Sequence, residues 1–311
     1  MSFSGNIKDE ISRQIPEESH CLRAEIAAII QFAGHVCREP GKKSVSIETE
    51  NVALAKKYLR LIKKAFAIQV DLEIRRRSAG KNHLYSIFIG EQKEAGRVIA
   101  EAVVEDCHEI CKKIFVGNCC RRAFIRGAFL AAGSMSDPAK SYHLEIVCRR
   151  EEIAKELAAV IAVYHIPAKI AGRKGKFIVY IKDSTGIVDL LNVMEAHKSL
   201  MELENIRIIK DMRNCANRQY NCDSANINKM VQAAARQLED IHYIEQNMGL
   251  DKLNAPLREM AMVRLEHPEV SLQEVGTYLN PPVGKSGVNH RLRKLGEIAD
   301  DLRRERESCD G

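Results

Sequence analysis

The chain has 311 residues, of which 45% are hydrophobic and 29% are charged, and its formal net charge is +6. This composition is typical of a folded globular protein, and the length allows two or three domains. No uncharged stretch reaches the roughly 18 residues that a membrane span requires, and the polar N-terminal residues do not resemble a signal peptide. The composition therefore disfavours a membrane protein, predicts a cytoplasmic location and permits a nucleic-acid partner without requiring one.

Ten cysteines are scattered along the chain, and reduced thiols are expected for a protein that is not secreted. Cys107 and Cys111, followed by Cys119 and Cys120, suggest a zinc site at first sight. However, no pair of histidines with zinc-finger spacing lies nearby. We therefore predict no metal site and no cofactor.

The most distinctive stretch runs from Arg122 to Pro138, and its middle consists mainly of small and apolar residues around Gly127. Glycine inside a helix costs roughly 1 kcal/mol relative to alanine, so a helix that keeps Gly127 is expected to need a smooth face for close packing. Gly133 is expected to close this helix in the left-handed conformation that ends many helices. Taken alone, the stretch is more simply explained as one buried core helix.

A second copy of this pattern ends at Gly34, which lies 99 residues before Gly133. The same offset relates Ile47 to Ile146, Ala55 to Ala154 and Ile62 to Ile161. Farther on, Ser86–Ile89 corresponds to Ile178–Ile181 at an offset of 92 residues, because a loop is shorter in the second copy. A repeat this long predicts a duplicated domain over residues 1–205, with copies at about 20–110 and 119–200.

This duplication resembles the LAGLIDADG homing endonuclease family. In that family two such helices pack side by side, and an acidic residue just before each final glycine holds the metal ions that cleave DNA. The resemblance implies that each repeat has the order αββαββα. Ala33 and Ala132 occupy the two acid positions here, and their methyl groups cannot bind a hard cation. We therefore expect the fold without catalysis, and no enzymatic activity.

Basic residues recur at the expected hairpin tips of both repeats. In the family just named the concave sheets straddle a duplex, so the resemblance implies that such tips could contact phosphates. Solvated tips without a partner explain the same pattern equally well. The candidate phosphate contacts, with two arginines from farther along the chain, are Arg75, Arg76, Arg77, Arg173, Lys174, Lys176, Arg213 and Arg218.

The composition changes after residue 205. The stretch from Asn214 to Asn228 is rich in asparagine, so we predict a linker over residues 206–230 and a separate domain over residues 231–311. In that domain Asn254 is placed to cap a helix that carries Pro256 in its first turn, and apolar residues recur at helical spacing. The second domain is therefore predicted to be all-α.

The C-terminal domain contains a pattern typical of a helix-turn-helix. Ser271 and Glu274 form a capping box at the start of a short helix, and a second helix begins at Lys285. Val288 and Leu292 are expected to face inward, which leaves the basic side of the second helix to contact DNA. The alternative is a basic, solvated helix in an ordinary bundle. The predicted DNA-binding residues are Ser271, Lys285, Ser286, Asn289, His290, Arg291, Arg293 and Lys294.

The turn between these helices resembles the last domain of bacterial sigma factors. The stretch from Pro281 to Leu295, together with the degenerate repeat, resembles the WhiA family of bacterial regulators over the whole chain. The resemblance implies an α+β fold, in which the duplicated LAGLIDADG-like domain precedes the helix-turn-helix domain.

The same resemblance implies a sequence-specific transcription regulator that binds double-stranded DNA at the nucleoid. Its expected process is sporulation, or cell division and chromosome segregation. RNA polymerase or another regulator is a candidate second partner. Two alternatives stay open: a protein-interaction scaffold without catalysis, and an active homing endonuclease, which Ala33 and Ala132 disfavour.

Overall fold

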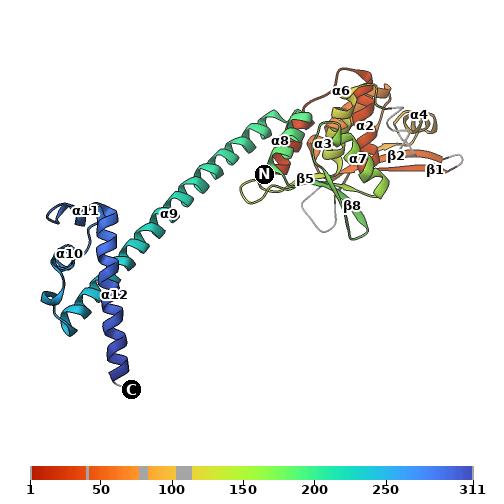
Figure 1. The fold of residues 1–311 in the computed structure, drawn as a ribbon. Coiled ribbons are helices and arrows are strands. Elements are labelled where there is room, and N and C mark those ends of the chain that lie inside the picture. Colours follow the sequence, from red (N-terminus) through yellow and green to blue (C-terminus); the bar gives the residue numbers. More distant parts are fainter. Residues whose placement is uncertain (1, 40–41, 77–82, 103–113, 310–311) are drawn as a thin grey trace. The chain divides into compact units, whose positions relative to one another are not determined.

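The computed structural model describes residues 2–39, 42–76, 83–102 and 114–309. The chain forms two compact units, Met1–Lys210 and Asp211–Gly311, and each has its own hydrophobic core (Figure 1). Among the helices of the described residues, none is long and apolar enough to cross a membrane.

The first unit contains the predicted duplication. After α1 (Phe3–Ser12), the first repeat consists of α2 (Ser19–Ala33), β1 (Gly34–Glu39), β2 (Lys42–Thr49), α3 (Val52–Phe66), β3 (Asp71–Arg76), β4 (His83–Ile89) and α4 (Gln92–Ala102). The second repeat consists of α6 (Asn118–Ala132), β5 (Gly133–Met135), β6 (Leu144–Cys148), α7 (Glu151–Ala162), β7 (Lys169–Arg173), β8 (Lys176–Ile181) and α8 (Ser184–Val193). Both copies follow the predicted order αββαββα.

Each repeat forms one four-stranded antiparallel sheet, with the strand orders β1-β2-β4-β3 and β5-β6-β8-β7. Equivalent residues occupy equivalent positions in the two sheets. Gly34 pairs with Ile47 in the first sheet, and Gly133 pairs with Ile146 in the second. The offset of 99 residues therefore reflects one fold used twice. Apolar side chains alternate along the strands, so one face of each sheet packs against the core and the other stays open.

α2 and α6 pack against each other in the centre of the first unit (Figure 1). The predicted close approach occurs at Gly127, where a methyl group would overlap the backbone carbonyl oxygen of Glu25 and lie 3.0 Å from Ala28 Cβ. Only glycine allows the two helices to come this near. The small-residue pattern thus reports a helix–helix contact between the two repeats.

The prediction that Gly133 ends its helix in the left-handed conformation is wrong. Gly34 and Gly133 have φ values of −81° and −82°, and each is the first residue of a strand. Their lack of a side chain has a steric reason instead, because an added Cβ at Gly34 would lie 2.5 Å from the carbonyl oxygen of Ile30. The chain turns directly from helix into sheet at these points.

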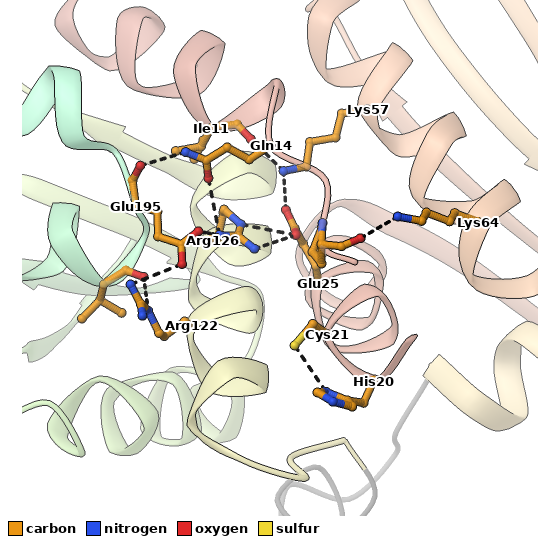
Figure 2. A network of polar contacts seen from close by, with 12 residues as sticks. Ile11, Gln14, His20, Cys21, Glu25, Lys57, Lys64, Arg122, Arg126 and Glu195 are labelled. Carbon is orange, nitrogen blue, oxygen red and sulfur yellow. Dashed lines mark hydrogen bonds and ion pairs between the residues drawn. The ribbon is translucent and has the colours of Figure 1, made fainter. Parts of the chain in front are cut away.

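A buried network of charges joins α2, α3 and α6 (Figure 2). Glu25 is fully buried, and its Oε1 lies 2.5 Å from Lys57 Nζ. Its Oε2 accepts hydrogen bonds of 3.3 Å from both Nε and Nη2 of Arg126. Lys57 also donates to the Ile11 carbonyl at 2.7 Å, and Arg126 Nη1 donates to Glu195 Oε2 at 2.8 Å. Burial lowers the pKa of Lys57, and the neighbouring Glu25 carboxylate opposes that shift. The ion pair therefore stabilises the charged form of Lys57 inside the core.

The segment predicted as a linker is part of a helix. α9 runs from His197 to Asn247, and the boundary between the two compact units, after Lys210, falls inside it. The asparagines between Asn214 and Asn228 are therefore helical. No glycine or proline interrupts α9, and asparagine costs less than either of them inside a helix.

The second unit contains helices and no strand among its described residues. After α9 it consists of η1 (Leu250–Lys252), α10 (Ala255–Glu266), α11 (Leu272–Thr277) and α12 (Lys285–Cys309). As predicted, the Asn254 side chain caps α10 by accepting a hydrogen bond of 3.1 Å from the backbone of Leu257. Its core brings together Ile241, Ile244, Leu253, Leu257, Met260, Ala261, Val275, Leu279, Val288, Leu292, Leu295 and Ala299.

Candidate nucleic-acid interface

The predicted capping box opens α11. The Ser271 hydroxyl oxygen accepts a hydrogen bond of 3.3 Å from the backbone of Glu274, and the backbone of Ser271 donates one of 2.9 Å to Glu274 Oε2. The hydrogen bond that the Ser271 backbone donates to the Glu274 carboxylate, and after it the interaction with the Ser271 side chain, lower the pKa of this carboxyl. They fix the start of α11 and therefore the direction in which the chain enters the turn.

Gly276 brings the turn back onto α11. The backbone of Val283 donates a hydrogen bond of 2.9 Å to the Gly276 carbonyl oxygen. A methyl group at Gly276 would overlap the carbonyl oxygen of Val283 and lie 3.2 Å from Val288 on α12. On the other side of the turn, the rings of His267 and Tyr278 stack with centroids 4.2 Å apart. The angle between the two helices therefore depends on a glycine that allows backbone to lie against backbone.

α12 has one buried side and one exposed basic side. Val288, Leu292 and Leu295 are buried in the core of the second unit, as the sequence predicted. The side chains on the opposite side are exposed and carry charge, amide, hydroxyl and imidazole groups: Lys285, Ser286, Asn289, His290, Arg293 and Lys294. Such a mixture can pair with phosphates and with base edges.

Two residues of the predicted set are engaged within the unit. Ser271 is half-buried, and its hydroxyl oxygen already caps α11. Arg291 is also half-buried, and its Nη1 lies 3.7 Å from Glu259 Oε2 on α10. Arg293, by contrast, is paired with Glu297 at 3.5 Å on a fully solvated surface, where an ion pair contributes little and its partner can be exchanged.

Ala33 and Ala132 are the last residues of α2 and α6. These are the two positions at which the resemblance to homing endonucleases implied metal-binding carboxylates in that family. Within the part of the chain that the structure describes, no group of acidic side chains able to hold a metal ion lies at these two helix ends. The side chains of Ala33 and Ala132 themselves supply no ligand for a hard cation.

The second hairpin tip is a compact basic projection. Arg173, Lys174 and Lys176 are all exposed, and the turn between their strands uses positive φ values of 49° at Lys174 and 75° at Gly175. Of the corresponding tip in the first repeat, Arg77 lies outside the described residues. The backbones of the two preceding arginines, Arg75 and Arg76, belong to β3.

Three carboxylates lie together on the open face of the first sheet. Asp71 pairs with Phe88, and Glu73 pairs with Ser86, on the side of the sheet opposite the buried isoleucines. Glu48 pairs with the same Ser86 from β2, so three carboxylates share this face. Arg213 and Arg218 are exposed on α9.

Known proteins resemble the chain over nearly its whole length. Three family profiles match: the WhiA N-terminal LAGLIDADG-like domain over residues 19–103, the WhiA LAGLIDADG-like domain over residues 121–213, and the WhiA C-terminal HTH domain over residues 216–299. A "Probable cell division protein WhiA" of Lachnoclostridium phytofermentans is 49% identical over 97% of this chain and 100% of that protein. The chain belongs to the WhiA family.

Other comparisons agree with this assignment. A protein of the same name from Alkaliphilus metalliredigens is 43% identical over 96% of this chain and 98% of its own length. The crystal structure of full-length DUF199/WhiA from Thermatoga maritima covers 97% of this chain and 99% of that one, with a TM-score of 0.61 and 25% identity. The WhiA helix-turn-helix profile begins within α9, which places the second half of this helix with the C-terminal domain.

Sequence reasoning missed three residues that position the helix-turn-helix of this WhiA-family chain. Arg264 is buried, and its Nη1 donates to the carbonyls of His267 and Val270 at 3.3 and 2.9 Å, which holds the segment before α11; burial lowers its pKa. Glu259 accepts a hydrogen bond of 2.7 Å from the backbone of Asn280 and so ties α10 to the turn. Gly276 is the third residue. Its position inside a six-residue helix is the one sign in the sequence that could have pointed to its role.

Proposed function

We propose that this WhiA-family chain is a sequence-specific DNA-binding regulator of transcription. The exposed row Ser286, Asn289 and Arg293 on α12 would recognise the bases, with Lys285 and Lys294 beside it on phosphates. The observation that carries this proposal is the division of α12 into a buried apolar side and an exposed basic side, directly after a capped α11. A helix presented in this way is the part of a helix-turn-helix that enters the major groove.

The process we propose is cell division with chromosome segregation, or sporulation. Its support is the name that the similar proteins carry, "Probable cell division protein WhiA", together with the coverage of nearly the whole chain in both directions. DNA at the nucleoid is the corresponding place of action. The carboxylates of Glu48, Asp71 and Glu73, which surround the exposed Phe88 on the open face of the first sheet, are better suited to a protein partner than to phosphate. RNA polymerase or another regulator is such a partner.

We also propose that the chain has no nuclease activity. Cleavage of DNA by this fold depends on cations held over the phosphate, and Ala33 and Ala132 offer no ligand. Incubation of supercoiled and linear DNA with the pure protein and magnesium or manganese should leave the DNA intact. Metal-dependent cleavage that co-purifies with the folded protein and disappears when the fold is disrupted would contradict this part of the proposal.

The central test compares a selected DNA site with random duplex at one fixed salt concentration. Asn289→Ala with Arg293→Ala should lower the preference for the selected site while leaving binding to random duplex and the circular dichroism spectrum unchanged. Each base contact is worth about 1–3 kcal/mol of discrimination. Lys294→Ala should weaken binding to both duplexes to a similar extent, because a phosphate contact carries no sequence information.

Arg304→Ala is the matched control for Arg293→Ala. Arg304 is an exposed arginine on the same helix, paired like Arg293 with a solvated acid. It lies eleven residues farther on, which is about three turns, or roughly 16 Å, along the same side. This control should leave the preference intact. If the ratio of the two affinities is the same in the Asn289/Arg293 variant and in the control, α12 does not recognise the bases.

A second contribution is proposed for the tip at Arg173, Lys174 and Lys176. Neutralising it by Arg173→Gln, Lys174→Asn and Lys176→Gln should reduce the slope of log K against log salt by roughly 0.9 for each phosphate that the tip no longer neutralises. Asparagine is chosen at Lys174 because it tolerates positive φ. A control that neutralises Lys56, Arg60 and Lys63 on the exposed side of α3 removes the same charge elsewhere. Equal slopes in the two variants would argue against a DNA contact at this tip.

A further inference from the structure

The N-terminal ends of α2 and α6 bring three thiols and an imidazole together. His20 and Cys21 lie in the first turn of α2, and Cys119 and Cys120 lie in the first turn of α6. The four ligand atoms all lie within 4.8 Å of one another. His20 Nδ1 is 3.2 Å from Cys120 Sγ, 3.3 Å from Cys21 Sγ and 4.0 Å from Cys119 Sγ. One imidazole nitrogen thus faces all three sulfurs.

These distances are those of a tetrahedral metal site. With Zn–S bonds of about 2.3 Å and a Zn–N bond of about 2.0 Å, tetrahedral angles place nitrogen and sulfur roughly 3.5 Å apart, and two sulfurs roughly 3.8 Å apart. The three observed nitrogen–sulfur distances scatter around the first of these values. Small side-chain rotations would therefore suffice to close the four ligands around one ion.

The surroundings are those expected of a zinc-binding histidine. His20 points Nδ1 at the sulfurs, and its Nε2 lies 3.9 Å from Glu18 Oε2 on the other side of the ring (Figure 2 shows the ring beside Cys21). A shift of the exposed Glu18 side chain to hydrogen-bond distance would favour the tautomer in which Nδ1 is free to bind the metal. The ligands come in two adjacent pairs, His20 with Cys21 and Cys119 with Cys120, and each pair lies in the first turn of its helix.

The four residues differ in burial. Cys21 and Cys120 are buried, His20 is half-buried and Cys119 is exposed. The exposed Cys119 gives a metal ion access to the sulfurs from solvent. No oxygen ligand belongs to the set, which excludes magnesium and calcium and favours a thiophilic ion such as zinc.

We propose that His20, Cys21, Cys119 and Cys120 bind one zinc ion that fastens the two repeats to each other. All four coordination positions are filled by the protein, as in structural zinc sites, so no position is left for a substrate. The site lies at the opposite ends of α2 and α6 from Ala33 and Ala132, so it is not a displaced nuclease centre. The zinc site would hold together two helices from chain segments about one hundred residues apart. This structural role is independent of the proposal that the chain binds DNA.

The first test is metal analysis of the full-length protein purified without chelator. It should contain about one equivalent of zinc, because four ligands complete one site. Cys21→Ser with Cys120→Ser should lose most of this zinc. The matched control, Cys215→Ser with Cys222→Ser, replaces two exposed cysteines outside the cluster and should retain it. Circular dichroism shows whether each variant is folded.

His20→Ala keeps the test decisive if the buried double variant fails to fold, because His20 is half-buried and its loss leaves the core intact. This variant should bind zinc more weakly. Cobalt substitution of the unaltered protein should produce thiolate-to-cobalt charge-transfer and tetrahedral d–d bands, which His20→Ala changes. Chelation should lower the unfolding temperature of the unaltered protein and expose Cys119 to alkylation.

Several results would overturn the proposal. One is protein free of metal that also fails to take up zinc or cobalt after reduction. Another is a disulfide among Cys21, Cys119 and Cys120 in the freshly purified protein. A third concerns Cys107 and Cys111, which lie outside the described residues. If the folded Cys21→Ser/Cys120→Ser variant keeps its zinc while a Cys107→Ser/Cys111→Ser variant loses it, the metal is bound elsewhere. Visible absorption typical of an iron–sulfur cluster in place of bound zinc would also refute it.

Discussion

Replacing Lys57 by methionine should destabilise the first unit by about 3–5 kcal/mol, the cost of removing one partner from a buried ion pair. Lys57 is 1% exposed, and its Nζ lies 2.5 Å from Glu25 Oε1 and 2.7 Å from the Ile11 carbonyl oxygen. Methionine fills a similar volume, so the change removes charge and donors more than packing. Glu25 would keep Arg126 on its other oxygen, but it would lose its shortest ion pair while remaining fully buried.

The assay is thermal unfolding of the full chain by calorimetry. For a unit of this size, each kcal/mol lowers the unfolding temperature by about 2–4 °C, so a decrease of roughly 6–20 °C is expected for the transition of the first unit. The transition of the second unit should not move and serves as an internal reference. Lys56→Met is the matched control, because Lys56 is the preceding residue on α3 and is exposed. It should shift the transition by no more than about 2 °C.

A double variant separates charge from packing. Adding Glu25→Gln to Lys57→Met removes the carboxylate that was left without its lysine, so the double variant should be more stable than Lys57→Met alone. A destabilisation below about 1 kcal/mol in Lys57→Met would refute the reasoning, since it would mean that the buried pair is replaceable without cost. Equal destabilisation in Lys57→Met and Lys56→Met would have the same meaning.

Three further predictions concern other parts of the chain. Burial raises the pKa of Glu156 to about 7, against a weaker opposing effect of Gln31, so the contribution of Glu156 to stability should fall as pH rises from 4.5 to 7. Relative to the unaltered protein, Glu156→Gln should therefore gain stability across that range, measured by denaturant unfolding at several pH values. Gly127→Ala should cost about 1–3 kcal/mol by pushing α2 and α6 apart, measured by denaturant unfolding. Gly276→Ala should destabilise the second unit similarly, whereas Gly296→Ala, which meets Asp240 Oδ2 at 3.4 Å, should not.

The duplication and the helix-turn-helix could be predicted from the sequence because both depend on periodic local patterns. Gly34 and Gly133 recur with the apolar strand positions that pair with them, and this recurrence survives because both repeats need the same turn from helix into sheet. The capping box at Ser271 and the inward positions Val288 and Leu292 are encoded within a few residues of each other. The predicted conformation of Gly133 was wrong. A glycine at the end of a helix can serve a left-handed backbone or a close steric contact, and the sequence is the same in both cases.

The asparagine-rich stretch shows a different limit. Asparagine favours turns because its side chain can form hydrogen bonds to the backbone, and this tendency suggested a linker between the two domains. In the structure the stretch from Asn214 to Asn228 is part of α9, because it contains no glycine or proline and the helix continues on both sides. Composition indicates where the domains change but not which backbone conformation connects them.

The sequence by itself determines the residue types, the offset between the repeats and the absence of both acidic residues. The tertiary structure decides which residues contact each other, because those contacts depend on how the helices pack. His20 and Cys21 lie about one hundred residues from Cys119 and Cys120, in adjacent pairs that match no familiar zinc spacing, and only the pairing of α2 with α6 brings them within ligand distance. Glu25, Lys57 and Arg126 form their network for the same reason, since each belongs to a different helix. Such long-range contacts arise from the shapes of packed helices, which local sequence patterns do not specify.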